Sequence, residues 1–339
     1  MEVRKMFHRF IRRSEFYLLI VFVVICILIQ FVSGGQLFIP ATIFNILRAM
    51  VVLGMFALVN MMVVVTGGFD LSFPTLAALT YAATVAILLE TGWGAVSVLP
   101  AFLIAAVIGG VLGMLNGLLI AYFKLNAMIV TLGTQTLFLG ISLGLFEFPE
   151  VQATLPRGLV DFGQLYLYEF FSEAGVRSAL TFTIVPFILL AVIVWFILNR
   201  TMYGRSLYAI GGSEISAERA GINVKLTKFI LYVFVGVTAG IIGIIRVSMA
   251  NQSIPIGLVG WDLMVIPAVI LGGASIYGGV GTVFGTILAV ALVQTVTNSL
   301  ILVGIDSAWQ DFFYGLVIIA GVTISAVQIK RRERKRGIQ

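Results

Sequence analysis

The chain has 339 residues, of which 60% are hydrophobic and only 11% are charged, and its mean hydropathy is +1.11. Soluble domains carry about 25% charged residues, so this composition excludes an ordinary soluble domain. A single cysteine, Cys26, excludes a disulfide within the chain. With one histidine, His8, there is little from which to build a zinc or haem site, and we expect no metal and no cofactor.

Apolar runs recur along the chain, each about as long as the 20 residues of a spanning helix. They predict an all-α membrane protein with about ten transmembrane helices. The predicted segments lie at about Phe16–Val32, Ile46–Val65, Ser72–Leu89, Val98–Ala121, Ala127–Phe146, Ala179–Leu198, Phe229–Val247, Trp261–Leu271, Val283–Val303 and Phe312–Ile329. The first follows a basic stretch, as in a signal peptide, but no A-x-A-like cleavage site comes after it. We therefore interpret it as a retained helix in a transmembrane domain spanning residues 16–329.

The basic residues predict the orientation of these helices. Of the 21 Lys and Arg residues, 17 lie in the tail at 1–15, after the fourth segment, in the loop at 199–228 or in the tail at 330–339. Ten helices place these four regions on one side, which the positive-inside rule makes cytoplasmic. The net charge of +6 thus favours anionic lipid over nucleic acid as a partner. We predict a multi-pass protein of the bacterial inner membrane with both termini in the cytoplasm.

The longest loop on the opposite side spans residues 147–178. It is rich in aromatic residues between Leu165 and Phe171. Aromatic side chains are enriched at membrane interfaces, so we expect this stretch to lie along the membrane surface. A landing surface for an external partner is compatible with the same composition.

Two glycine-rich stretches, Thr66–Ser72 and Leu271–Gly281, interrupt apolar helices. Glycine weakens a helix, and the freed backbone groups need partners inside the protein or in a wet cavity. The sequence therefore predicts two helix breaks, which often line the binding sites of transporters, with close helix packing as the alternative. Asp70 either accepts backbone N–H groups at the start of the third segment or contacts a solute.

Polar side chains within the apolar segments are costly against lipid, so they should face the interior of the bundle. The neutral group around Gln135 suits a polyhydroxylated solute, or bonds the helices to one another. Arg48 is near an outer helix end and can extend to the interface. The candidates for the translocation pathway are Asn60, Gly67, Gly68, Asp70, Ser72, Asn116, Thr131, Gln135, Gly272, Gly273 and Asn298.

The cytoplasmic loop at 199–228 contains the pattern of a short helix. Ser213 is a good N-cap, Glu214 lies in the first turn, Arg219 in the last, and Gly221 just past the end. We expect a helix over residues 214–220. A helix of two turns is marginal in water, so it needs a surface to dock on, and a solvated loop is the alternative.

Four motifs resemble, in order, the ribose/galactose/xylose-type permeases of ATP-binding-cassette importers. They are VTGGFDLS at 65–72, TLGT at 131–134, GRSLYAIGGSEISAERAGINV at 204–224 and AVILGGASIYGGVGTVFGT at 268–286. The resemblance implies an importer permease fold and a dimer of identical or related permeases. It also implies two cytoplasmic ATPases and an extracytoplasmic solute-binding protein. The residues that it places against the ATPase are Glu214, Ala217, Glu218, Arg219 and Gly221.

The chain departs from the family pattern beside both glycine motifs. Phe73-Pro74-Thr75 stands where members commonly continue Val-Gly-Ser, and Pro267 is unusual before the second motif. These changes bear on which solute is carried. Pentoses, hexoses, polyols, furanosyl signals and nucleosides all stay open as solutes. The resemblance favours a sugar.

The chain has no GxxxxGK[ST] phosphate-binding loop. We therefore expect a permease subunit that is not an enzyme, with ATP hydrolysed by another chain. The alternative is an ion-coupled secondary transporter, which would have acids deep in several helices. Only Asp70 and Asp262 fit that requirement.

Overall fold

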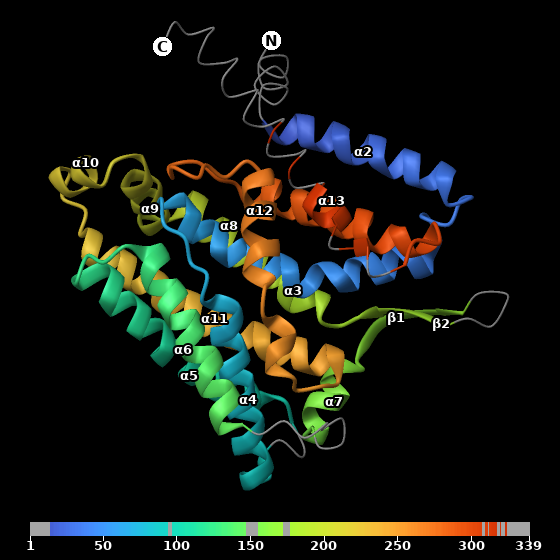
Figure 1. The fold of residues 1–339 in the computed structure, drawn as a ribbon, viewed down its shortest axis with the longest axis horizontal. Coiled ribbons are helices and arrows are strands. Elements are labelled where there is room, and N and C mark those ends of the chain that lie inside the picture. The colour runs from blue at the N-terminus through green and yellow to red at the C-terminus, as the bar shows by residue number, and fades with distance from the viewer. Residues whose placement is uncertain are drawn as a thin grey trace, which may run out of the picture.

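A computed structural model describes residues 14–93, 97–146, 155–171, 177–306, 309–310, 312–316, 319 and 323 (Figure 1). The described part of the protein is almost wholly helical, with one small hairpin. The long helices are α2 (Ser14–Val32), α3 (Pro40–Val65), α4 (Phe73–Thr91), α5 (Leu99–Gly117), α6 (Ala127–Leu145), α8 (Ile184–Arg200), α11 (Val224–Ala250) and α13 (Val283–Leu302). The shorter elements are the π-helix η2 (Leu118–Tyr122), α7 (Arg157–Gly163), β1 (Tyr166–Phe171), β2 (Arg177–Thr181), α9 (Met202–Gly212), α10 (Glu214–Arg219), the 3-10 helix η3 (Pro255–Leu258) and α12 (Trp261–Leu271).

The all-α membrane class is confirmed, but the count of ten helices is not. Among the described residues, seven helices are long and apolar enough to span a membrane, or eight if α8 and α9 form one span with a bend of 72°. The eighth predicted segment, α12, has only 11 residues because Gly272 ends it. The tenth, Phe312–Ile329, lies mostly outside the described residues, as do the two predicted cytoplasmic tails.

Helix α3 forms the centre of the bundle. Every residue from Met50 to Val65 is buried, including Asn60, so this part of the helix meets protein on all sides. It begins six residues before the predicted Ile46, at Pro40, because proline suits the first turn of a helix. Of the other long helices, α8, α11 and α13 pack directly on it (Figure 1).

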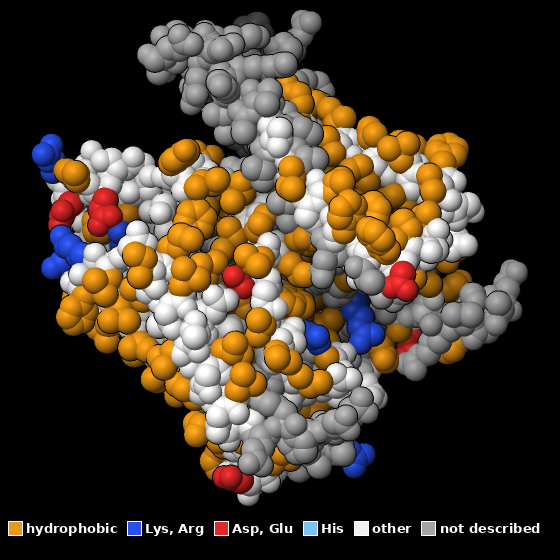
Figure 2. All heavy atoms as spheres, in the orientation of Figure 1, with side chains coloured by type: hydrophobic (Ala, Val, Ile, Leu, Met, Phe, Trp, Pro, Cys, Tyr) orange, Lys and Arg blue, Asp and Glu red, His pale blue; other side chains and the backbone are white. Residues whose placement is uncertain are grey.

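Helices α5 and α11 pack closely through glycines. A Cβ atom at Gly109 would lie 2.3 Å from the carbonyl oxygen of Gly236, and one at Gly236 would lie 2.2 Å from that of Gly109. Such small-residue contacts let two backbones approach within a membrane. The other side of α5 exposes Leu103, Val107 and Val111, at intervals of one helical turn. Hydrophobic side chains cover much of the surface beside these helices, as expected for contact with lipid (Figure 2).

The hairpin corrects the sixth predicted segment. We expected a helix from Ala179, but β2 pairs antiparallel with β1 as far as Thr181, and α8 begins at Ile184. The aromatic run in β1, Tyr-Leu-Tyr-Glu-Phe-Phe, has strong strand propensity, which explains the difference. The contact of this loop with the membrane surface stays a prediction, and residues 147–154 and 172–176 lie outside the described part.

The hairpin and α10 lie at opposite ends of the molecule (Figure 1). Because α3 and α11 run between these ends, a position along either helix tells which end a residue is near. We call the end with α10 the inner end and the other the outer end.

Candidate coupling helix and translocation pathway

Helix α10 is exposed and capped at both ends. The Ser213 hydroxyl accepts a hydrogen bond from the backbone N–H of Ser216 at 3.2 Å. At the other end Gly221 has φ +84°, and the Ile222 N–H donates to the Ala217 carbonyl at 3.1 Å. These bonds satisfy polar groups that a helix end leaves open, so a helix of six residues can persist.

The two faces of α10 differ. Ala217 is buried against Ile210 and Val224, whereas Glu218 and Arg219 are exposed. The buried face fixes the helix to the protein. The exposed face leaves hydrophobic and charged side chains free for another surface, since Ile215 is 66% exposed.

Helix α9 precedes α10 and was not expected from the sequence. Thr201 caps it by accepting the Gly204 N–H at 3.1 Å. Gly204 lies against α8, where a Cβ would come within 2.2 Å of the Ile197 carbonyl oxygen. The segment was predicted as a loop because it is too polar to span a membrane. The Thr201 cap was the signal that could have revealed the helix.

The two glycine-rich breaks touch each other, and the end of α9 touches both. The Gly279 N–H donates to the Val65 carbonyl at 2.8 Å. A Cβ at Gly211 would lie 1.9 Å from the Val65 carbonyl oxygen and 2.5 Å from the Gly279 nitrogen. A Cβ at Gly278 would lie 2.8 Å from both the Gly67 nitrogen and the Gly211 carbonyl oxygen. We call this contact of three chain segments, which involves Val65, Gly67, Gly211, Gly278 and Gly279, the glycine junction.

The glycine junction adjoins α10 directly, because only Gly212 and Ser213 separate Gly211 from Glu214. The Tyr208 hydroxyl adds a hydrogen bond to the Gly281 carbonyl at 2.7 Å. Backbone atoms in contact leave little room for independent movement. The end of α9, two residues before α10, is therefore in backbone contact with both breaks.

A buried polar network holds the first break in shape. One Asp70 carboxylate oxygen accepts hydrogen bonds from the Ser72 N–H at 2.8 Å and the Ser72 hydroxyl at 2.7 Å. Asn116 of α5 donates to the Ser72 hydroxyl at 2.8 Å, and Asn60 of α3 donates to the Asp70 carbonyl at 3.0 Å. The Thr131 hydroxyl of α6 donates to the Phe69 carbonyl at 3.2 Å. The break is thus bonded to three helices.

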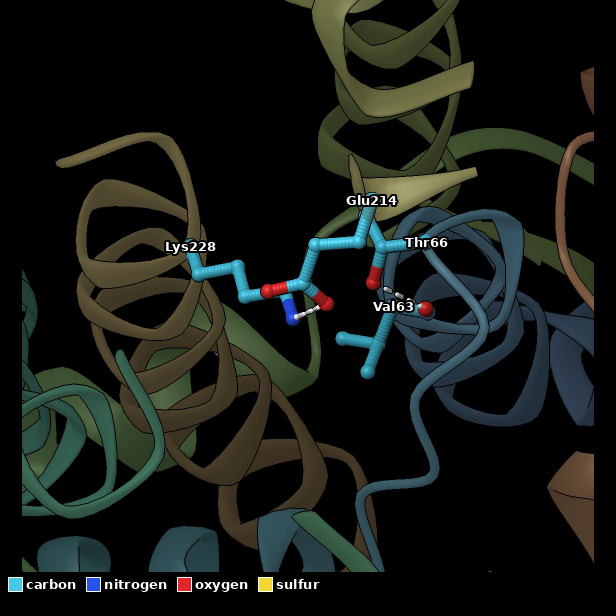
Figure 3. A network of polar contacts seen from close by, with 4 residues as sticks. All are labelled: Val63, Thr66, Glu214 and Lys228. Carbon is cyan, nitrogen blue, oxygen red and sulfur yellow. Dashed lines mark hydrogen bonds and ion pairs between the residues drawn. The ribbon is translucent and has the colours of Figure 1, made fainter. Parts of the chain in front are cut away.

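A cavity of about 260 Å³ lies at the inner end, which we call the inner cavity. Thr66, Gly67 and Gly68 of the first break line it, together with Glu214 and Lys228. The Lys228 ammonium and the Glu214 carboxylate are 2.6 Å apart. Figure 3 shows this pair beside Thr66, whose hydroxyl donates to the Val63 carbonyl at 2.7 Å. The first residue of α10 therefore lies next to the end of α3.

A larger cavity of about 590 Å³ lies at the outer end, which we call the outer cavity. It lies between the first turns of α3, the last turns of α11 and the second half of α13. Its polar and aromatic lining residues include Thr42, Asn45, Arg48, Arg246, Trp261, Gln294, Thr297, Asn298 and Gln310. Basic side chains lie in a hollow on the face shown in Figure 2.

Comparison with known proteins places this architecture in a family. The family described as "Branched-chain amino acid transport system / permease component" matches residues 42–322. The ribose import permease protein RbsC of Bacillus subtilis (strain 168) is 33% identical over 285 residues, which are 84% of each chain. The chain belongs to this family of transport permeases.

Two further relatives agree with the assignment. The D-allose transport system permease protein AlsC of Escherichia coli (strain K12) is 29% identical to the permease over 268 residues, covering 79% of this chain and 76% of that one. The autoinducer 2 import system permease protein LsrD of Photorhabdus laumondii is 30% identical over 292 residues, covering 85% and 84%. No solved structure matches the permease. These relatives confirm the resemblance to simple-sugar importer permeases and a transport component rather than an enzyme.

Most of the predicted pathway residues fall into two groups in the structure: those that form hydrogen bonds around the first break and those that line a cavity. Asn60, Asp70, Ser72, Asn116 and Thr131 bond the first break to its neighbours, and none of them lines either cavity. Gly67 and Gly68 line the inner cavity, and Asn298 lines the outer one.

The remaining candidates lie near the second break. Gln135 donates to the Asp262 carboxylate at 3.2 Å and so joins α6 to α12. Gly272 packs on α13, where its Cβ would lie 2.8 Å from the Gly285 carbonyl, and Gly273 follows it in the turn.

Sequence reasoning missed Arg246 and Gly211. Arg246 is a basic residue inside the predicted segment Phe229–Val247, and a charge at such a position marks a functional site. That signal was available. The guanidinium of Arg48 donates to the Met249 carbonyl at 2.8 Å and lines the outer cavity, and its extension to the membrane interface stays a prediction. No pattern in the sequence marks Gly211, because its role depends on two distant segments.

Proposed function

We propose that the permease is the membrane-spanning subunit of an ATP-driven importer, and that it carries a sugar or a similar polyhydroxylated solute. The observation that carries this proposal is the capped, exposed helix α10, fixed within two residues of the glycine junction. Such a helix suits a cytoplasmic ATPase as a docking element, with Glu218 and Arg219 on its exposed face. Gly221 would end the helix and Ala217 would hold it in place.

In this mechanism the ATPases move α10 when they bind or hydrolyse ATP. The glycine junction transmits that movement to both breaks, and the first of them lines the inner cavity. The permease then alternates between inward- and outward-open states, whose relative free energies depend on nucleotide and on the binding protein. Asp70 and its partners keep the first break in a defined shape during the exchange.

The outer cavity is the proposed entry for solute delivered by an extracytoplasmic binding protein. Its volume is within the range of small-ligand sites. Amide groups such as that of Asn298 and hydroxyl groups such as that of Thr297 pair with sugar hydroxyls without requiring charge. The relatives named for ribose, allose and autoinducer 2 import support this class of solute.

A second permease, identical or related, would complete the pathway. We place the assembly in the bacterial inner membrane with α10 and both termini on the cytoplasmic side. The basic residues near α10, Arg205, Lys225 and Lys228, agree with that orientation.

Reconstitution tests the proposal. The permease, its ATPase and its binding protein are placed in proteoliposomes, and uptake of radiolabelled ribose, allose and related sugars is measured with and without ATP. We expect uptake of at least one sugar only when all three proteins and ATP are present. Uptake by the permease alone, driven by an ion gradient, would contradict the proposal.

A further inference from the structure

We propose that the outer cavity is a carboxylate-binding site, in which Arg48 and Arg246 pair with a carboxylate group. The carboxylate belongs either to the solute or to an acidic side chain of the binding protein. Only the naming of these two sources rests on the proposed function. The site itself follows from the positions of the two arginines.

Both guanidinium groups are held in place but keep free donors. Arg48 donates one hydrogen bond, to the Met249 carbonyl at 2.8 Å. The Arg246 guanidinium lies 5.9 Å from the centre of the Trp261 ring, in a cation–π arrangement. A guanidinium has five N–H donors, so each arginine retains several for a ligand.

Neither arginine has an acidic partner in the described part of the chain. The ion pairs found there join Arg157 to Asp161 and Lys228 to Glu214. Asp262 lies in the first turn of α12, close in sequence to Trp261. Its carboxylate accepts a hydrogen bond from Gln135 and does not line the outer cavity. The cavity thus has two cations and no anion from these residues.

The two positive charges act on each other as well. Arg246 is partly buried, and the Arg48 charge is near enough to repel it. Two like charges that line one cavity repel each other, which raises the free energy of the empty state. An anion that binds both removes this cost, and a carboxylate fits the fork of a guanidinium through two parallel hydrogen bonds.

The rest of the lining suits a ligand that also has hydroxyl groups. The Asn298 amide donates to the Gln294 side chain at 3.1 Å, which orients both amides along one side of α13. Asn45 and Thr42 are on α3, near Arg48. A carboxylate with neighbouring hydroxyls would therefore find both kinds of partner.

A matched pair of compounds tests the site directly. Gluconate and sorbitol share a six-carbon polyhydroxylated skeleton, but only gluconate has a carboxylate. The thermal unfolding midpoint of the purified full-length permease is measured with sodium gluconate, with sorbitol, and with sodium chloride at the same ionic strength. If the solute supplies the carboxylate, gluconate raises the midpoint in a saturable way and the other two do not.

The variants Arg48→Gln and Arg246→Gln then weaken gluconate binding by roughly tenfold each, since each loses a charge-assisted pair. Arg246→Lys keeps the charge and loses the fork, so it retains part of the binding. Arg205→Gln, an exposed change on α9 at the inner end, serves as the control and behaves as the wild type.

A second arm covers the other source. Binding of the companion binding protein to the permease in lipid nanodiscs is measured at low and high salt. If the binding protein supplies the carboxylate, gluconate is no better than sorbitol, but Arg48→Gln and Arg246→Gln weaken docking by roughly tenfold and reduce its salt dependence. The proposal is overturned if gluconate equals sorbitol and docking is unchanged in both variants.

The gluconate arm needs neither ATP nor transport. It therefore separates failure of this site from failure of the importer mechanism. A permease that transports only neutral sugars, and whose arginine variants dock and bind normally, would keep its proposed function and lose this site.

Discussion

The inner and outer ends of the permease differ in the kind of atoms that meet there. At the inner end, three chain segments meet through backbone atoms, and glycines allow separations that any side chain would prevent. At the outer end, long polar side chains surround a cavity about twice the volume of the inner one. Backbone contacts are stiff and transmit displacement, whereas amide and guanidinium groups select a ligand. In the proposed mechanism, coupling and recognition therefore occupy separate ends of one bundle.

The largest effect should follow from reversing the charge on the exposed face of α10. Glu218→Lys leaves the permease folded, because the side chain is exposed, but abolishes its assembly with the ATPase. Gly221→Pro should have the same outcome, since proline cannot adopt φ +84°. Co-purification measures assembly, and Glu90→Lys at the exposed end of α4 is the control. Co-purification of the Glu218 variant at wild-type yield would remove α10 from the interface.

Asp70→Ala should damage the shape of the first break and leave solute selection unchanged. It removes the acceptor for the Ser72 N–H and the Ser72 hydroxyl, both buried. A buried donor left unpaired costs about 1–3 kcal/mol, so the unfolding midpoint should fall clearly. Thermal unfolding measures the loss, with the exposed Asp161→Ala as control. A changed solute profile at normal stability would instead place Asp70 in the recognition site.

Asn298→Ala should affect recognition at the outer end without affecting assembly. Loss of a neutral hydrogen bond of about 0.5–1.5 kcal/mol would raise the KM for uptake by roughly two- to tenfold. Asn199 is a matched control, because each asparagine donates from its side chain to the carbonyl four residues before it. Asn199 is exposed at the end of α8 and outside the cavity. Equal KM values for the two variants would show that the outer cavity does not contact solute.

The smallest effect on stability should come from Lys228→Gln at the inner cavity. Its partner Glu214 has a side chain that is 50% exposed, so solvent screens the pair. We expect a loss below about 1 kcal/mol in unfolding experiments. A much larger loss would mean that the ion pair, and not the glycine junction, holds α10 to the bundle.

The sequence predicted the parts of this fold that depend on local chemistry. Apolar length located most long helices, and Ser213, Glu214 and Gly221 located α10 to within one residue. The glycine motifs located both breaks. What it could not predict depends on which segments meet. That Asn60 and Asn116 bond to the first break, or that Gly211 lies on Val65, follows from tertiary packing alone.

The sequence also placed all of the buried polar candidates in the translocation pathway. Buried amides in membrane helices can serve packing or passage, and both require the same residue types. The structure bonds Asn60 and Asn116 to the first break, joins α6 to α12 through Gln135, and leaves Asn298 at a cavity. Arg246 was visible as a charge in an apolar run, but only the structure shows that it lines a cavity together with Arg48.

Uptake by a Gly211→Ala permease, assembled with its ATPase, tests the central claim most directly. The added Cβ would lie 1.9 Å from the Val65 carbonyl oxygen and must force the junction apart, whereas a Cβ at the adjacent Gly212 meets nothing within 4 Å. We predict that Gly211→Ala still co-purifies with the ATPase but loses most ATP-driven uptake, and that Gly212→Ala retains both. Wild-type uptake by an assembled Gly211→Ala complex would contradict the glycine junction as the link between motor and pathway.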